Sequence, residues 1–244
     1  MFRFGCFVLA AISLRAQTID LPKLAAEIRA SYYHPDALSS LRCGVTFDWD
    51  GLLDSLKTAA SESRMKVLNG ASVTVRSERG QTTTVEIEWR EGEPTNKAAI
   101  EQSFQQMLAG FFQIYWPFAG SGLTPSPGDK LEAQPMESGG YIVTSAADGN
   151  LKMTTEVDKE RVPSKISLEN PAFKASLAMR FSTIPGAARR LSELDVHEEV
   201  GTSIINARVT MDYQDVGSFH IPRHVHFDLG TIAVSFDLMN CSAQ

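Results

Sequence analysis

The sequence predicts an α+β fold that is mainly β, in which a curved antiparallel sheet, open like half a barrel, is covered by amphipathic helices. From Tyr141 onward, short segments alternate apolar and polar residues and are separated by turns, which is typical of an antiparallel meander. Residues 20–33 and 96–116 carry apolar residues at helical spacing. An open sheet needs a cover for its apolar face, and these two segments are the available cover.

The first helix is expected over residues 20–33. Asp20 can cap its start, Pro22 suits its first turn, and His34-Pro35 ends it. A strand with one buried face is then expected over residues 44–50, where Val45, Phe47 and Trp49 alternate with polar residues.

The next segment leaves two interpretations open. Residues 51–63 show helical spacing, and Asn69-Gly70 is a tight-turn dipeptide. Either this dipeptide forms a hairpin turn between residues 64–68 and 72–76, or the helix continues to Leu68 and ends at Gly70. A further strand is expected over residues 82–90, where apolar and polar residues alternate.

The clearest helix is expected over residues 96–116. Its apolar stripe consists of Ile100, Phe104, Met107, Leu108, Phe111 and Tyr115. Residues 118–140 are rich in proline and glycine and predict a long loop, either a mobile flap or an internal boundary. Residues 96–140 are therefore interpreted as a helical insertion followed by a loop.

The second half of the chain predicts consecutive strands. The series begins at about Tyr141, and strands are expected at about residues 151–157, 165–169, 173–181, 205–213, 219–227 and 232–238. Residues 185–194 are expected to form a loop or a short helix.

Composition narrows the class of protein. The chain has 244 residues, of which 43% are hydrophobic and 21% charged, and its formal net charge is −6. This predicts a globular protein with enough apolar residues for a substantial core. It argues against a nucleic-acid binder, which needs a basic face. No apolar run reaches the roughly 18 residues of a membrane-spanning helix.

Residues 1–16 are interpreted as a secretory signal peptide. Arg3 supplies the positive start, an apolar stretch runs from Phe4 to Leu14, and Ala16 is a small residue at the expected cleavage point. The alternative is a buried N-terminal strand or helix. A lipidated cysteine needs an apolar run before it, but most of this stretch follows Cys6, so lipidation is not expected. We therefore expect a periplasmic or secreted protein in which residues 17–244 form a single half-barrel domain.

Cleavage leaves two cysteines, Cys43 and Cys241. An oxidising compartment favours a disulfide, and two cysteines are the smallest number that can pair. A bridge would tie the first strand region to the last, and a loop of this length corresponds to roughly 5 kcal/mol of chain-entropy stabilisation. The alternative is two buried free thiols.

Two segments share one order of features: a strand, a turn, an apolar residue before proline, and a second strand. They are residues 157–166 and residues 212–225, and the second contains Tyr-x-Asp-Val-Gly-x-Phe-x-Ile-Pro. With the export signal and the leading helix, this pattern resembles the periplasmic lipoprotein-carrier (LolA-like) superfamily. The resemblance covers mainly residues 141–240 and more loosely residues 20–90. It implies an unclosed barrel whose mouth is crossed by helices and whose apolar cavity holds acyl chains.

The leading hypothesis is a non-enzymatic exported protein that holds a lipid or another apolar ligand between sheet and helices. It needs no cofactor and no catalytic residue. The side chains that either line such a cavity or simply fill the core are Trp49, Trp89, Phe104, Met107, Phe111, Tyr115 and Trp116.

Two alternatives belong to other functional classes. His220, His224 and His226 share one parity in a strand, so they could face one side and bind the metal of a secreted hydrolase. Apolar residues hold the opposite parity, which favours simple surface histidines. Ser121 between two glycines lacks the strand–turn–helix context of a nucleophile. The other alternative is an interaction module for envelope proteins, which would use an exposed sheet edge.

Overall fold

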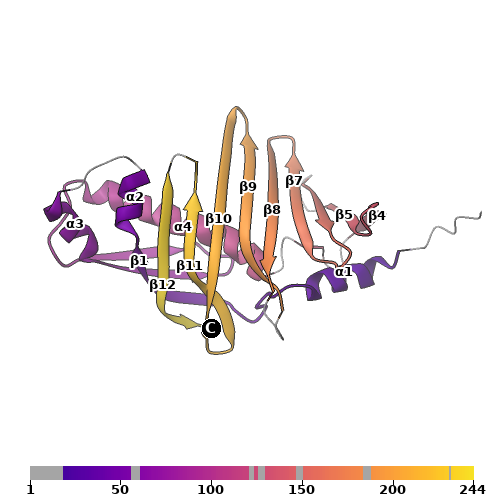
Figure 1. Cartoon of the computed structure of the whole chain (residues 1–244), viewed down its shortest axis with the longest axis horizontal. Helices are drawn as coiled ribbons and strands as arrows, with labels where there is room; N and C mark the ends of the chain where they lie inside the picture. Colours follow the sequence, from indigo (N-terminus) through magenta and orange to yellow (C-terminus); the bar gives the residue numbers. More distant parts are fainter. Residues whose placement is uncertain are drawn as a thin grey trace, which may run out of the picture.

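The computed structural model describes residues 19–55, 61–120, 124–125, 130–146, 151–183, 188–230 and 232–244. The expected signal peptide, residues 1–16, lies outside this range, as does Ser121. Within the described residues, the chain forms one curved, unclosed antiparallel sheet of twelve strands and four helices (Figure 1). The mainly β fold with helices against the sheet, predicted from the sequence, is therefore confirmed.

The helices are α1 Leu21–Ala30, α2 Trp49–Ser55, α3 Glu62–Asn69 and α4 Lys97–Ala119. The strands are β1 Ser40–Phe47, β2 Ala71–Glu78, β3 Thr84–Trp89, β4 Leu131–Pro135, β5 Tyr141–Ala146, β6 Lys152–Val157, β7 Pro163–Asn170, β8 Phe173–Ser182, β9 Arg190–Val200, β10 Ser203–Val216, β11 Phe219–Asp228 and β12 Ala233–Ala243.

The strand order explains the position of α4. The strands follow one another across the sheet in the order β3-β2-β1-β12-β11-β10-β9-β8-β7-β6-β5-β4. Strands β3 and β4 are therefore consecutive in the sequence but form opposite edges of the sheet. The chain must cross from one edge to the other, and the 23 residues of α4 supply about 34 Å of that path. In crossing, α4 buries its apolar stripe in the main core. The helix interpreted as an insertion is thus the central cover of the sheet.

We call the side of the sheet that carries the core the inner face, and the opposite side the outer face. The aromatic rings of Phe111 on α4 and Phe236 on β12 meet edge to face, 5.6 Å apart. Helix α1 forms a second, smaller core, in which Leu24 and Ile28 pack with Val143 and Val157. Two helices therefore cover different parts of the inner face.

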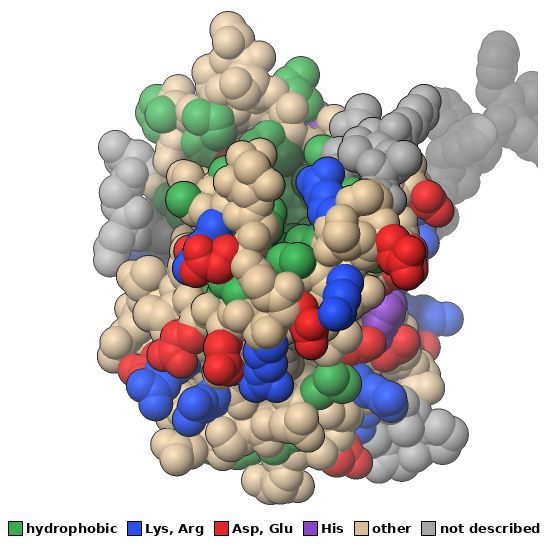
Figure 2. Space-filling view, turned by 90° about the vertical axis from the view of Figure 1, so that its left-hand side faces the viewer, with side chains coloured by type: hydrophobic (Ala, Val, Ile, Leu, Met, Phe, Trp, Pro, Cys, Tyr) green, Lys and Arg blue, Asp and Glu red, His purple; other side chains and the backbone are tan. Residues whose placement is uncertain are grey.

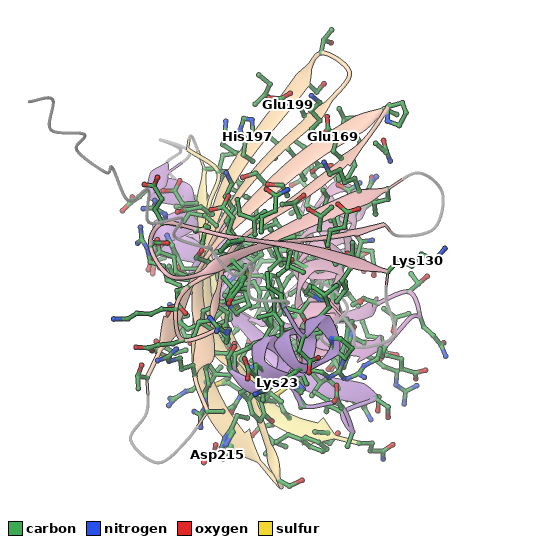
Figure 3. The ribbon with its side chains drawn as sticks, turned by 90° about the vertical axis from the view of Figure 1, so that its right-hand side faces the viewer. Lys23, Lys130, Glu169, His197, Glu199 and Asp215 are labelled. Carbon is green, nitrogen blue, oxygen red and sulfur yellow. A yellow bond between two sulfur atoms is a disulfide. The ribbon has the colours of Figure 1, made fainter. Side chains whose placement is uncertain are left out.

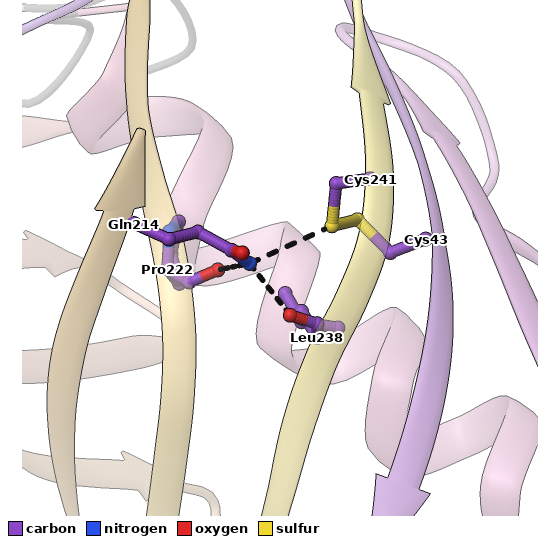
Figure 4. The surroundings of a disulfide bond; sticks show 5 residues. All are labelled: Cys43, Gln214, Pro222, Leu238 and Cys241. Atoms are coloured by element: carbon purple, nitrogen blue, oxygen red, sulfur yellow. Dashed lines mark hydrogen bonds between the residues drawn. A yellow bond between two sulfur atoms is a disulfide. The ribbon is translucent and has the colours of Figure 1, made fainter. Parts of the chain in front are cut away.

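The cysteines form the predicted bridge between neighbouring strands. Cys43 on β1 and Cys241 on β12 are joined, with an S–S distance of 2.13 Å (Figure 4). The side-chain amide of Gln214 donates to the carbonyl oxygen of Leu238 over 2.6 Å and lies 3.7 Å from the sulfur of Cys241. The disulfide therefore fastens the first strand to the last strand of the meander.

Several predicted boundaries are wrong, and each has a local cause. The first helix ends at Ala30, although the predicted cap is confirmed, since Asp20 accepts from the N–H of Lys23 over 3.1 Å. The strand expected over residues 44–50 stops at Phe47. Asp48 then accepts from the N–H of Gly51 over 3.0 Å and caps α2, so Trp49 is helical.

The hairpin interpretation of Asn69-Gly70 is also wrong. Helix α3 runs to Asn69, and the N–H of Gly70 donates to the carbonyl oxygen of Lys66 over 3.0 Å, so this dipeptide ends a helix. The alternative interpretation, a helix that ends at Gly70, is confirmed for residues 62–69. Residues 56–60, which belong to the expected helix over 51–63, lie outside the described range.

Two strands were missed. The loop expected over residues 118–140 contains β4, and α4 continues to Ala119 with Pro117 inside it, because the buried Phe118 and Ala119 extend its apolar stripe. The segment expected as loop or short helix over residues 185–194 contains the start of β9. A bulge opposite Arg180 and Phe181 interrupts the alternation of β9 there, which hid the strand pattern.

Candidate functional site

Most of the predicted cavity residues fill the core. Phe104 stacks on Phe47 at 4.6 Å, and Trp49 lies 5.3 Å from Phe104. The indole N–H of Trp89 donates to Glu101 over 2.9 Å, and Met107 is half-buried against the core. These four predicted residues therefore pack in or against the core and do not line a common cavity.

The other three predicted residues lie along the C-terminal half of α4. The indole N–H of Trp116 donates to the hydroxyl of Ser77 over 2.7 Å, and this ring borders an open groove between α4 and the β2–β3 turn. Arg79 lies over the same ring at 5.7 Å and donates to the carbonyl oxygens of Pro35 and Asp36. The groove has a volume of about 540 Å³, and backbone carbonyls hold the guanidinium on its wall.

Phe111 and Tyr115 border a small internal cavity between α4 and strands β9 to β11. The cavity volume is about 20 Å³. That is room for about one water molecule, whereas ligand pockets typically span about 300–1,000 Å³. Its lining includes Tyr32, Tyr33, Tyr115 and Tyr213. The space under α4 is therefore closed to a lipid chain while the helix stays in place.

The tyrosines around this cavity differ in their hydrogen bonds. The hydroxyl of Tyr213 donates to the carbonyl oxygen of Leu191 over 2.8 Å, and that of Tyr33 accepts from the N–H of His220. The buried hydroxyl of Tyr115 has no hydrogen-bond partner among the described residues. Burial raises the pKa of Tyr115 and of Tyr213, because the charged phenolate would lose its hydration.

An apolar part of the inner face remains open at the far ends of β7 to β10. The register pairs Phe173 with Val200 and Leu177 with Val196, without a bulge between them, so Val200 lies on the inner face with the buried Leu194. On β10, Ile205 has the same parity as the buried Val209. Val200 is 47% exposed and Ile205 48%. With the half-buried Leu168 and Phe173, they form a surface that we call the open strip.

The open strip is continuous with the core along β10. Ile205, Ala207, Val209 and Met211 follow one another on the inner face, and exposure falls from Ile205 to the buried Val209. Hydrophobic side chains also gather near the top of the molecule and in a recess below it (Figure 2). An apolar chain laid on the open strip would therefore run toward the edge of α4.

One carboxylate lies beside this surface. Glu198 pairs with Ala175 on β8 and with Ile205 on β10, so it projects from the same inner face. A ligand with an anionic head group would meet this charge at close range, and a neutral one would not. The open strip thus favours an uncharged apolar ligand.

The three histidines do not form one site. Strand β11 has an extra residue between its pairings with Met211 and Tyr213, and this bulge puts His220 on the opposite face from His224 and His226. His220 pairs with Asp215, His224 lies 2.9 Å from Asp237, and His226 lies 2.8 Å from Ser235. The described residues contain no group of three or more side chains that could hold a metal ion. The expectation that the three histidines share one face of the strand is therefore wrong.

Sequence reasoning found part of the open strip and missed the rest. It placed Ile205 on an apolar strand face but missed β9, which supplies Val200: residues 185–194 were expected as a loop or a short helix, and residues 195–200 were not assigned. Two adjacent isoleucines after Gly-Thr-Ser, at positions 201–205, were the available signal. Among the described helices, none is long and apolar enough to cross a membrane. Comparison with family models, curated proteins and solved structures finds no match to this chain.

Proposed function

We propose that this protein is a non-enzymatic exported binding protein that holds a neutral apolar ligand, such as the acyl chain of a lipid, on its inner face. The observation that carries the proposal is the open strip, an apolar surface on the inner face of an unclosed sheet. Side chains on a core-facing surface are normally covered, and an uncovered apolar surface of this kind is typical of binding sites.

The driving force would be burial of hydrocarbon. Each methylene group removed from water contributes about 0.8 kcal/mol, so a chain of several methylenes against Val200 and Ile205 supplies a binding energy. A chain that reaches beyond Ala207 meets Val209 and Met211, which are buried beneath the helical cover. Deeper binding would therefore require α4 to shift, and shallow binding would not.

Two further features support the proposal. The unclosed sheet with helices on its inner face agrees with the architecture expected from the LolA-like resemblance. The Cys43–Cys241 disulfide agrees with an oxidising compartment, as expected for an exported protein.

The test is a fluorescence titration of residues 17–244 with the neutral dye N-phenyl-1-naphthylamine, followed by displacement with monopalmitin. We expect the unmodified protein to bind both, and Ile205→Glu to weaken binding at least tenfold, because it puts a charge on the open strip. Met239→Glu is the matched control, since Met239 is 42% exposed and next to the inward Leu238 on β12. It should bind like the unmodified protein.

The charge of Glu198 gives the titration a second arm. Palmitate should displace the dye less well than monopalmitin. In Glu198→Gln, the two ligands should displace the dye more nearly equally. Absence of dye binding, or an equal loss in Ile205→Glu and Met239→Glu, would contradict the proposal. Circular dichroism of each variant ensures that only folded protein is compared.

A further inference from the structure

The β9–β10 hairpin ends in an uncharged, exposed tip. Residues 200–206 are all exposed, and none of them is charged. We call these residues the hairpin tip. The two-residue turn contains Gly201, whose φ is 59°, and Val200 pairs with Ser203. The hairpin extends beyond the neighbouring strands (Figure 1).

Apolar side chains project from both faces of this tip. Val200 and Ile205 lie on the inner face, whereas Ile204 pairs with Glu199 and lies on the outer face. Ile204 is 63% exposed, the highest value among the large exposed hydrophobic residues of the described chain. The open strip accounts for Val200 and Ile205, but a ligand on the inner face leaves Ile204 in water.

From this arrangement we propose that the hairpin tip inserts into the surface of an uncharged lipid bilayer and docks the protein there. A protein partner with one apolar face would cover one side of the hairpin, whereas a bilayer surrounds both. The ladder between β9 and β10 pairs part of the hairpin backbone, which lowers the cost of bringing it into an apolar environment.

The charges below the tip select the type of membrane. Glu169, Glu198 and Glu199 lie beside the tip strands, and Lys174 is the neighbouring cation, 3.0 Å from Glu169. His197 is hydrogen-bonded to Glu199 and Asn206. Glu169, His197 and Glu199 lie near the same end of the strands (Figure 3). The group of side chains named here contains three carboxylates and one lysine. It therefore disfavours an anionic lipid surface and is compatible with a zwitterionic one.

The proposal goes beyond ligand binding and is tested without any ligand. Residues 17–244 are sedimented with vesicles of phosphatidylcholine, and separately with vesicles that contain 30% phosphatidylglycerol (~0.1 M salt in both cases). We expect binding to phosphatidylcholine, weaker binding to the anionic vesicles, and at least a tenfold lower partition coefficient for Ile204→Glu. Met239→Glu, which changes an exposed apolar residue elsewhere, should bind like the unmodified protein.

A second variant reports the position of the tip directly. The tryptophan fluorescence of Ile204→Trp should shift to shorter wavelength when phosphatidylcholine vesicles are added, and that of Met239→Trp should not. The proposal is overturned if the unmodified protein stays in the supernatant, if Ile204→Glu and Met239→Glu bind equally, or if Ile204→Trp shows no shift.

Discussion

The hydroxyl of Tyr115 is one of the unsatisfied polar groups in the buried part of the described chain. It is buried, borders the small cavity under α4 and has no partner among the described residues. Tyr213 borders the same cavity, but its hydroxyl donates to the carbonyl oxygen of Leu191. The two tyrosines therefore border one cavity and differ in whether the hydroxyl has a hydrogen-bond partner.

Removing the hydroxyl should change the free energy of unfolding in opposite directions at the two positions. Tyr115→Phe should raise the free energy of unfolding by about 1 kcal/mol, because it removes a buried, unpaired hydroxyl. Tyr213→Phe should lower it by about 1 kcal/mol, because it leaves the carbonyl of Leu191 without its donor. Urea denaturation at pH 7 measures both, and a loss of stability in Tyr115→Phe would show that its hydroxyl is in fact paired.

Single residues also mark the limits of sequence reasoning. The cap at Asp20 was predictable, because a capping residue followed by proline and an apolar helical stripe is a local pattern. The cap at Asp48 was not predicted, because Phe47 and Trp49 continue the alternation of the preceding strand. There the side-chain hydrogen bond to Gly51 decides the structure, and apolar spacing alone does not reveal it.

At the scale of elements, most strands were predictable, whereas β4 and β9 were missed and a bulge in β11 changed the face of one predicted residue. Strand β8 alternates without interruption between Phe173 and Arg180, and the sequence predicts it closely. Strand β9 is bulged, and β11 is bulged between Pro222 and Val225, which reverses the face of His220. Register depends on the partner strand, and one sequence does not specify where a bulge falls.

The disulfide between β1 and β12 should be a major contribution to stability. It closes a sequence separation of 198 residues, which corresponds to roughly 5 kcal/mol in the chain-entropy treatment. We expect the double variant Cys43→Ala/Cys241→Ala, and the reduced unmodified protein, to unfold at lower urea concentrations by similar amounts. Reductant should leave the double variant unchanged. Equal midpoints for the oxidised and reduced protein would contradict this prediction.

At the scale of the whole molecule, the fold class was predictable but the strand order was not. The apolar periodicity of both halves indicated a sheet covered by helices. It did not show that β1 pairs with β12, or that β3 and β4 form opposite edges, because these are long-range pairings. The role of α4 follows from that order. The predicted aromatic residues mostly fill the core, and the open strip depended on a strand that the sequence concealed.

Stability should decrease at alkaline pH. Burial raises the pKa of Tyr32, Tyr33, Tyr115 and Tyr213 above the ordinary value of 10.0. Above that pH the unfolded chain loses phenolic protons that the folded chain keeps, so unfolding becomes more favourable as pH rises. The urea midpoint should be lower at pH 11 than at pH 9, and Tyr115→Phe should reduce the difference. A midpoint independent of pH in this range would show that these tyrosines ionise freely.

The central claim is that the inner face holds a neutral apolar ligand, and native mass spectrometry of protein purified without detergent tests it most directly. We predict a bound mass that organic extraction identifies as an uncharged lipid. We also predict that Ile205→Glu, prepared identically, shows the unliganded mass while Met239→Glu retains the adduct. An unliganded mass for the unmodified protein, or an adduct that survives equally in Ile205→Glu, would contradict the account.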